Sequence, residues 1–305
     1  MDSILQHYSR KDIQKAILSI AKNREVVAKF KGDRFNRRPD VLLHEADILE
    51  LAKQGATSFH MSVERWTDPL KLTQSMGKRE MDQLRSGWDL LLDIDSKFVE
   101  YSKVGAYLVV EALKFYNIKD IFVKFSGGSG FHILVPFESF PLNVNTFETK
   151  FLYPEGVRVI ASYLKEMIYS HLSEQILSLN TISEISKILN IEMKDLLNER
   201  GFNPFSVVDI DSVLISPRHL FRSPYSINEK TGLVSVPISL LKIKNFALKD
   251  AKITNVDVDS AKYLQDLKGE PGEAGKLILQ AFDWAMKNKK EDINELNKAK
   301  EFTVP

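Results

Sequence analysis

The chain has 305 residues and no cysteine. Disulfide bonds, zinc sites built from cysteine thiolates and thiol catalysis are therefore excluded. An excess of either charge is also missing, because 42 Lys and Arg residues stand against 41 Asp and Glu residues. The overall charge does not point to a nucleic-acid partner, although a local basic patch can still bind one. Residues 1–22 are polar and amphipathic, and no apolar run is long enough to cross a bilayer. We expect a cytoplasmic protein without a signal peptide or transmembrane segment.

Hydrophobic periodicity predicts a mixed fold of the α/β or α+β class. Strands are predicted at residues 25–30, 57–64, 90–95, 121–125, 132–137, 207–215 and 233–238, and helices at residues 12–22, 41–53, 101–116, 157–179, 183–199 and 273–298. The helical block of residues 155–200 separates two groups of strands. We therefore expect an insertion or subdomain there, and one core formed by residues 1–154 and 201–305. Apolar residues recur in this block at helical spacing and predict a face that either packs on the core or docks a partner: Ile168, Leu172, Ile176 and Leu179.

Residues 88–95 read Trp-Asp-Leu-Leu-Leu-Asp-Ile-Asp, an apolar strand that ends in Asp93 and Asp95. Because these two carboxylates are two residues apart on a strand, they share one face. A buried strand should not end in two like charges on one face unless a cation meets them. The alternative is an edge strand with its acids in solvent, and the D-x-D pattern alone is weakly specific.

A second predicted strand carries acids at the same spacing. Asp209 and Asp211 alternate with apolar residues in the segment Val-Asp-Ile-Asp-Ser-Val, residues 208–213. Hard divalent cations take oxygen ligands, and a two-metal site for nucleotidyl transfer uses a third carboxylate besides the first pair. Neither acidic strand contains a compensating Lys or Arg. This favours a metal site, and the alternative is again a solvated strand end.

A glycine-rich turn, Ser-Gly-Gly-Ser-Gly at residues 126–130, joins two predicted strands, and His132 follows it. The turn is compatible with a simple β-hairpin, and it lacks the Gly-Lys-Ser/Thr of a P-loop. Its small residues would still let backbone N–H groups and hydroxyls approach a triphosphate. The basic segment of residues 217–233 contains Arg218, Arg222 and Lys230. It is either an ordinary basic loop or a platform for phosphate groups.

Together these segments resemble the catalytic small subunit of archaeal and eukaryotic DNA primases, in the archaeo-eukaryotic primase superfamily. The family's first motif is an apolar strand ending in D-x-D, which Asp93 and Asp95 match. Its second motif is S-G-x-x-G-x-H, which the chain matches with Ser126, Gly127, Gly130 and His132.

The likeness continues on both sides of these motifs. The family's third region is an acidic strand, matched best by Asp209, and a segment of the type (R/K)-x-P-x-S-(L/V)-H-x-K-T-G, matched by residues 222–232. Asn23-Arg24-Glu25 resembles the family's R-E pair, in which the arginine reaches a nucleotide. The similar segments follow one another in the family's order, and their combination is far more specific than any single motif.

The chain departs from the family pattern in the residues at three places, and the segment between the third acid and Arg222 differs by about one residue from the usual spacing. Gly128 and Ser129 stand where members often carry arginines, so some triphosphate contacts are missing or come from other residues. Asn228 replaces a histidine, and it can donate a hydrogen bond but cannot become charged. The Cys/His zinc knuckle of many relatives cannot form without cysteine, and the helical block of residues 155–200 occupies its place.

The resemblance implies a primase catalytic fold, with an N-terminal α/β unit packed on a unit like an RNA-recognition motif and the site in the cleft between them. It implies template-directed synthesis of short RNA primers, or DNA primers, for DNA replication. Two Mg²⁺ or Mn²⁺ ions would be held by Asp93, Asp95 and Asp209, with Asp211 as the alternate. The residues implied to bind nucleotide are Arg24, Ser126, Gly127, Ser129, His132, Arg222, Asn228 and Lys230.

The implied partners are a single-stranded DNA template, ribonucleoside triphosphates and a primase large subunit in a heterodimer within a primosome. Deoxynucleoside triphosphates are the alternative substrates, and the nucleoid is an alternative location. Two other functions stay open. One is a single-chain primase-polymerase or repair polymerase of the same superfamily. The other is a non-catalytic nucleic-acid-binding subunit, against which the retained acids argue.

Overall fold

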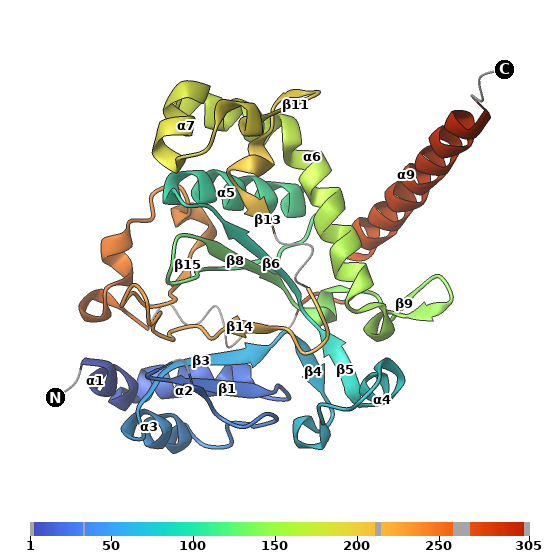
Figure 1. Ribbon diagram of the computed structural model, residues 1–305. Coiled ribbons are helices and arrows are strands. Elements are labelled where there is room, and N and C mark those ends of the chain that lie inside the picture. The colour runs from blue at the N-terminus through green and yellow to red at the C-terminus, as the bar shows by residue number, and fades with distance from the viewer. Residues whose placement is uncertain (1–2, 33, 211–214, 259–268, 302–305) are drawn as a thin grey trace.

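The computed structural model describes residues 3–32, 34–210, 215–258 and 269–301 of the chain. Two antiparallel sheets lie in the middle of the molecule, with helices on their outer sides (Figure 1). The mixed α/β class predicted from the sequence is confirmed. Among the described residues, no helix is both long and apolar enough to span a bilayer.

The first sheet has four strands in the order β14-β3-β1-β2. These strands are β14 (Leu220–Arg222), β3 (Ala56–Ser62), β1 (Val26–Phe30) and β2 (Arg34–Phe35). Helices α1 (Ser3–Ser9), α2 (Lys11–Ala21) and α3 (Glu45–Lys53) cover one face of it (Figure 1). Tyr8 of α1 packs edge-on against Phe59 of β3, with ring centroids 5.0 Å apart, so this face belongs to the core.

The second sheet has five strands in the order β13-β6-β8-β7-β15. These strands are β13 (Asp209–Ile210), β6 (Leu90–Asp95), β8 (Phe131–Val135), β7 (Phe122–Phe125) and β15 (Pro237–Ile238). Helix α5 (Val99–Phe115) and, beyond it, α6 (Glu155–Leu179) and α7 (Ile182–Leu189) lie on the side away from the first sheet (Figure 1). Leu90, Leu92 and Ile94 of β6 are fully buried. Because they alternate with Leu91, Asp93 and Asp95, the acids lie on the opposite face.

The smaller elements lie at the periphery. They are α4 (Lys78–Leu84), the paired strands β4 (Glu64–Trp66) and β5 (Arg85–Trp88), the hairpin β9 (Asn143–Val144) and β10 (Phe147–Glu148), and the hairpin β11 (Leu197–Asn198) and β12 (Gly201–Phe202). The last helix, α9 (Gly275–Glu301), packs on α6 at its start and then projects from the body (Figure 1).

Four predicted elements differ from those observed, and one is the strand expected over residues 233–238, of which only Pro237–Ile238 forms β15. The helix expected from residue 41 begins at Glu45, because the Asp47 carboxylate accepts the N–H groups of Leu43 and His44 and sets the N-terminus there. The helix expected over residues 183–199 ends at Leu189, where Asn190 adopts the left-handed conformation of a helix C-terminus. The strand expected over residues 207–215 is observed only as β13, and residues 211–214 lie outside the described part.

Helix α6 is integral to the main core. The docking interpretation of its apolar face is wrong for Ile168, Leu172 and Ile176, because all three are buried in the same cluster as both sheets. Only Leu179, at the end of the helix, is exposed. The spacing alone could not separate a packed face from an open one.

A buried ion-pair cluster joins the two sheets. Asp89, which precedes β6, is fully buried and pairs with Arg24, which precedes β1. Arg65 of β4 also pairs with Asp89 at 2.5 Å. Arg24 donates further to the carbonyls of Ser62 and Val63, each at 2.8 Å. Burial alone would raise the pKa of the Asp89 carboxyl, but the two guanidinium groups outweigh it and hold that pKa below its ordinary value.

We expect Asp89→Asn to lower the free energy of unfolding by about 3–5 kcal/mol, because it leaves the buried Arg24 guanidinium without its counter-charge, whereas Arg65 keeps its pair with Glu138. The matched control is Glu166→Gln, which breaks the exposed pair with Arg200 and should cost less than about 1 kcal/mol. Urea denaturation measures both. The stabilisation that Asp89 contributes should be fully present above about pH 3.9, the pKa of its carboxyl in the unfolded chain. It should be lost as the pH falls from there through the lower pKa of the carboxyl in the folded protein. Equal costs for the two variants would contradict a stabilising role for this cluster.

Candidate active site

Strand register gathers polar residues on one face of the five-stranded sheet. Asp93 of β6 lies directly opposite His132 of β8, and His132 lies opposite Lys124 of β7. One step along, Asp95 of β6 lies opposite Asp209 of β13. Directly opposed residues project to the same face, and Asp93 and Asp95 share a face by their spacing. All five side chains therefore lie on the face that α5 leaves open.

The three carboxylates differ in their surroundings. The Asp93 side chain is 47% exposed, and its Oδ1 lies 3.5 Å from Nε2 of His132. Asp95 is exposed and accepts a hydrogen bond of 2.7 Å from the Ser129 hydroxyl. Asp209 is exposed as well. Like charges directly opposite each other destabilise a sheet. A cation bound beside the facing Asp95 and Asp209 would relieve their repulsion.

These carboxylates suit a hard divalent cation in donor type and in sharing one face. In this arrangement they do not form a complete coordination site. Among the described residues, no group of three Asp, Glu or His side chains is arranged closely enough to hold a metal ion. Asp211, the alternate third ligand, lies outside those residues. The acids therefore fit the metal in chemistry, and their side chains would have to rotate toward it.

The glycine turn between β7 and β8 is organised by its own serine. The Ser126 hydroxyl accepts the N–H groups of Gly128 and Gly130, at 3.2 and 3.3 Å. These two amides therefore point inward in this conformation. Gly127, with φ of +89°, occupies the left-handed region, and its carbonyl accepts the Thr231 hydroxyl. The turn is thus tied both to Asp95, through Ser129, and to the basic segment, through Thr231.

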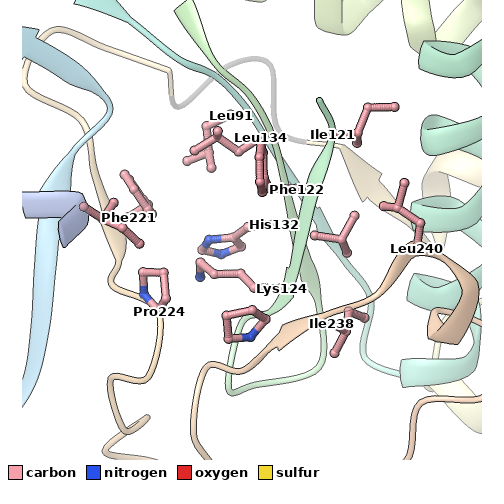
Figure 2. A pocket seen from close by; sticks show the side chains of 13 residues that line it. Leu91, Ile121, Phe122, Lys124, His132, Leu134, Phe221, Pro224, Ile238 and Leu240 are labelled. Carbon is pink, nitrogen blue, oxygen red and sulfur yellow. The ribbon is translucent and has the colours of Figure 1, made fainter. Parts of the chain in front are cut away.

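His132 and Lys124 form the polar wall of an otherwise apolar pocket (Figure 2). Both project from the five-stranded sheet toward Phe221 of β14, whose ring centroid lies 6.4 Å from that of His132 and 5.9 Å from the Lys124 ammonium. Burial, together with the charges of Lys124 and Arg222, holds the pKa of His132 well below its ordinary value. The imidazole is therefore neutral at pH 7, and its buried Nδ1 has no hydrogen-bond partner within the described part of the chain.

Sequence reasoning missed Lys124. Its side chain is buried and donates 2.8 Å to the Ser235 hydroxyl, and burial lowers its pKa well below the ordinary value. The only sequence signal was a lysine within an apolar strand, two residues before Ser126. Its place beside His132 depends on pairing between distant strands.

The basic segment is internally paired. Arg222 lies next to His60 across β14 and β3, and its guanidinium pairs with Glu229 at 2.9 Å. Glu229 also pairs with Lys29 of β1 at 2.6 Å. Burial raises the pKa of Glu229, but the hydrogen bond from Lys29 and the charge of Arg222 outweigh it and lower that pKa to about 2. A phosphate group at Arg222 would have to compete with this carboxylate.

The remaining predicted nucleotide ligands lie in different places. The Asn228 side chain accepts the N–H of Lys230 at 2.9 Å and so stabilises the turn, while Lys230 itself is exposed. The Arg24 guanidinium lies 5.9 Å from the Phe221 ring centroid and donates to Asp89 and to backbone carbonyls. In this arrangement Arg24 joins the two sheets, and its contact with nucleotide stays a prediction. The structure thus brings together Asp93, Asp95, Asp209, Ser129 and His132, with Arg222 nearby.

The profile of the family described as DNA primase small subunit matches residues 89–240, about half of the chain. This stretch contains both acidic strands, the glycine turn and the basic segment. The chain belongs to the DNA primase small-subunit family. Members of this family are primase catalytic subunits, nucleotidyltransferases that use divalent metal ions.

Two relatives are similar in sequence to parts of the chain. The DNA primase small subunit PriS of Pyrobaculum aerophilum is 29% identical over 191 residues, which cover 54% of this chain and 57% of that protein. An uncharacterized protein of Methanocaldococcus jannaschii is 40% identical over 78 residues, which cover 25% of this chain and 17% of that one. The match therefore spans little more than half of the length of PriS and a smaller share of the second relative.

A solved structure has a similar fold. The polymerase domain of Mycobacterium tuberculosis Ligase D, determined in complex with DNA, superposes with a TM-score of 0.50 at 14% identity. The superposition covers 90% of this chain and 91% of that domain. The fold of that polymerase domain thus extends over nearly the whole chain.

Gly130 holds the glycine turn against the acidic strand. A Cβ at this position would lie 2.9 Å from Asp95 Oδ1 and would also collide with the Ile94 carbonyl. We expect Gly130→Ala to destabilise the protein by about 1–3 kcal/mol, as overpacking does. Gly128→Ala is the matched control, because its Cβ would meet only Asn228 and Ser126 atoms at 3.6 Å. Urea denaturation of both variants checks this, and a tolerated Gly130→Ala would mean that the turn does not press on β6.

Proposed function

We propose that this family member is a primase-type catalytic subunit that performs template-directed synthesis of short primers by nucleotidyl transfer. The observation that carries the proposal is the pairing of Asp95 with Asp209 beside Asp93, on the one sheet face where His132 also lies. The five-stranded sheet with its helices would be the unit like an RNA-recognition motif, and the four-stranded sheet the N-terminal unit. The substrates would be a single-stranded DNA template and ribonucleoside triphosphates, and a large subunit would assist initiation.

Asp93, Asp95 and Asp209 would hold two Mg²⁺ or Mn²⁺ ions, with Asp211 as the alternate to Asp209. Bound ions would lower the pKa of the attacking 3′-hydroxyl and stabilise the pyrophosphate leaving group. The chain's own residues would position the triphosphate. A neutral His132 can donate one hydrogen bond to a phosphate oxygen, and Arg222 can offer a planar guanidinium once Glu229 gives way. Ser126, Gly127, Ser129, Asn228 and Lys230 would complete the cradle.

A second candidate is a repair polymerase of the same superfamily that acts without a partner. The observation that favours it is the fold likeness to the Ligase D polymerase domain, which extends over 90% of the chain. One assay separates the two. Template-directed incorporation is measured with labelled ribo- and deoxynucleotides in parallel, with Mg²⁺ or Mn²⁺, with and without a primer. Efficient extension with deoxynucleotides by the isolated chain would favour the repair polymerase. Incorporation of neither nucleotide would refute both.

We expect Asp93→Ala and Asp95→Ala each to abolish incorporation without unfolding the protein. In the absence of metal, removing one of the crowded carboxylates relieves repulsion, so the melting temperature should stay constant or rise. Asp209→Asn should reduce incorporation far more than Asp211→Asn. The reverse order would assign the third ligand to Asp211, and full activity of Asp95→Ala would refute the metal site.

We expect His132→Ala and Arg222→Ala to raise the apparent KM for nucleotide, each by roughly ten- to a hundredfold. A lost hydrogen bond to a charged phosphate is worth about 1.5–3 kcal/mol, which corresponds to this range. Template affinity should change little. Arg79→Ala on α4 is the control, because Arg79 is exposed and lies on a peripheral helix. If the variants bind nucleotide normally but lose affinity for the template, His132 and Arg222 belong to the template site and not to the nucleotide site.

A further inference from the structure

The hairpin of β1 and β2 presents an exposed aromatic ring among cations. Phe35 is 55% exposed. It lies directly opposite Lys29, whose ammonium is 5.7 Å from its ring centroid. Lys31, Arg34 and Arg37, on the same hairpin and just after it, are all exposed. A chain with almost no net charge thus has a local group of exposed cations beside an exposed aromatic ring.

This surface is continuous with the candidate active site. Arg222, Lys29 and Phe35 project from one face of the four-stranded sheet, by the cross-strand register of β14, β3, β1 and β2. Glu229 links Arg222 to Lys29 by two ion pairs. Because neighbouring strands are about 4.8 Å apart, three strand spacings place Phe35 about 14 Å from β14. A strand of nucleic acid that leaves the site across this sheet would reach the hairpin.

The chemistry of the hairpin favours nucleic acid over protein. The centre of a protein interface is depleted of charged residues, whereas Lys29 lies directly opposite Phe35 and the exposed Lys31 and Arg37 lie close to it in the chain. Proteins that hold single strands combine a positively charged path for the phosphates with aromatic rings on which the bases stack. The hairpin has both parts.

We propose that Phe35 stacks on a base of a single-stranded nucleic acid, and that Lys31 and Arg37 bind the neighbouring phosphates. The hairpin is then a strand-holding site, separate from the residues that hold metal and triphosphate. The inference rests on the proposed function for its ligand, the template, but it makes a claim about binding that can be measured without catalysis.

Binding is measured by fluorescence anisotropy with labelled oligo(dT), without nucleotide or divalent cation. We expect Phe35→Ala to weaken binding by about five- to a hundredfold, the range that loss of one stacked base gives. Phe35→Trp should bind as well as the wild type. Phe115→Ala is the matched control, because Phe115 is 68% exposed but lies at the end of α5. Circular dichroism verifies that each variant is folded.

The salt dependence of oligo(dT) binding separates the contribution of the Phe35 ring from that of the cations. Arg37→Gln should reduce the slope of log K against log salt by about 0.7, the value for one phosphate contact on a single strand. Phe35→Ala should lower the affinity and leave the slope unchanged. In Phe35→Trp, oligo(dT) should quench the fluorescence of the new tryptophan, a signal that an allosteric effect of the substitution would not give.

The outcomes distinguish the inference from the function on which it rests. If the wild type binds oligo(dT) and Phe35→Ala binds equally well, the stacking site is refuted and the proposed function stands. If the wild type does not bind oligo(dT) at all, both fail. If Phe35→Ala changes only the oligomeric state in size-exclusion chromatography, the ring is a protein contact and the inference is overturned.

Discussion

The buried pairing of Asp89 with Arg24 and Arg65 sets the geometry on which the candidate site depends. Asp89 stands immediately before β6, the strand that ends in Asp93 and Asp95. Arg24 stands before β1, in the other sheet. A charge that is buried without its partner is costly, so neither sheet can shift relative to the other without breaking the cluster. The acids are thereby fixed relative to β14, which carries Phe221 and Arg222.

Two further buried carboxylates act in the same way along the same seam. Glu25 pairs with Arg38 at 2.8 Å and with Arg218 at 2.6 Å, which ties the chain before β14 to the start of β1. Glu64 of β4 pairs with the fully buried Arg85 of β5. Arginine is well suited to this role, because its planar fork can bind two acceptors at once and is always charged. The near-zero net charge of the chain therefore conceals strong internal pairing, because Arg38, Arg85 and Arg218 are neutralised by buried carboxylates.

Most polar groups of the candidate site also have partners within the protein. The Ser126 hydroxyl holds the amides of its own turn, Ser129 holds Asp95, and Arg222 is held by Glu229. Each of these groups has a partner that a phosphate or a metal ion could replace. Binding would then exchange contacts and would not simply fill an open site, and the net gain for each contact would be smaller than the gross hydrogen-bond energy. His132 differs, because its buried Nδ1 lacks a partner within the described residues.

The parts of this structure that sequence could predict are those set by local periodicity. The strand over residues 90–95 and the helix α5 follow from apolar spacing, and the shared face of Asp93 and Asp95 follows from the two-residue period. Pairing between distant segments could not be predicted. The strand β14 looked like a basic loop because its partner, β3, lies far away in the sequence. Lys124 looked like an ordinary strand residue for the same reason.

Arg24 shows the limit of motif reasoning most clearly. Its neighbours resemble a family motif in which the arginine reaches nucleotide, but here its guanidinium is buried against Asp89. A motif records which residue types recur, whereas the direction of a side chain depends on which counter-charge the fold buries beside it. Exposed cations remain at many places on the surface, and Lys31 and Arg37 of the β1–β2 hairpin lie close in the chain to the exposed Phe35. Because a neutral chain has no long-range field to hold a polyanion, grip on a strand must come from such short-range contacts, in which stacking adds to charge.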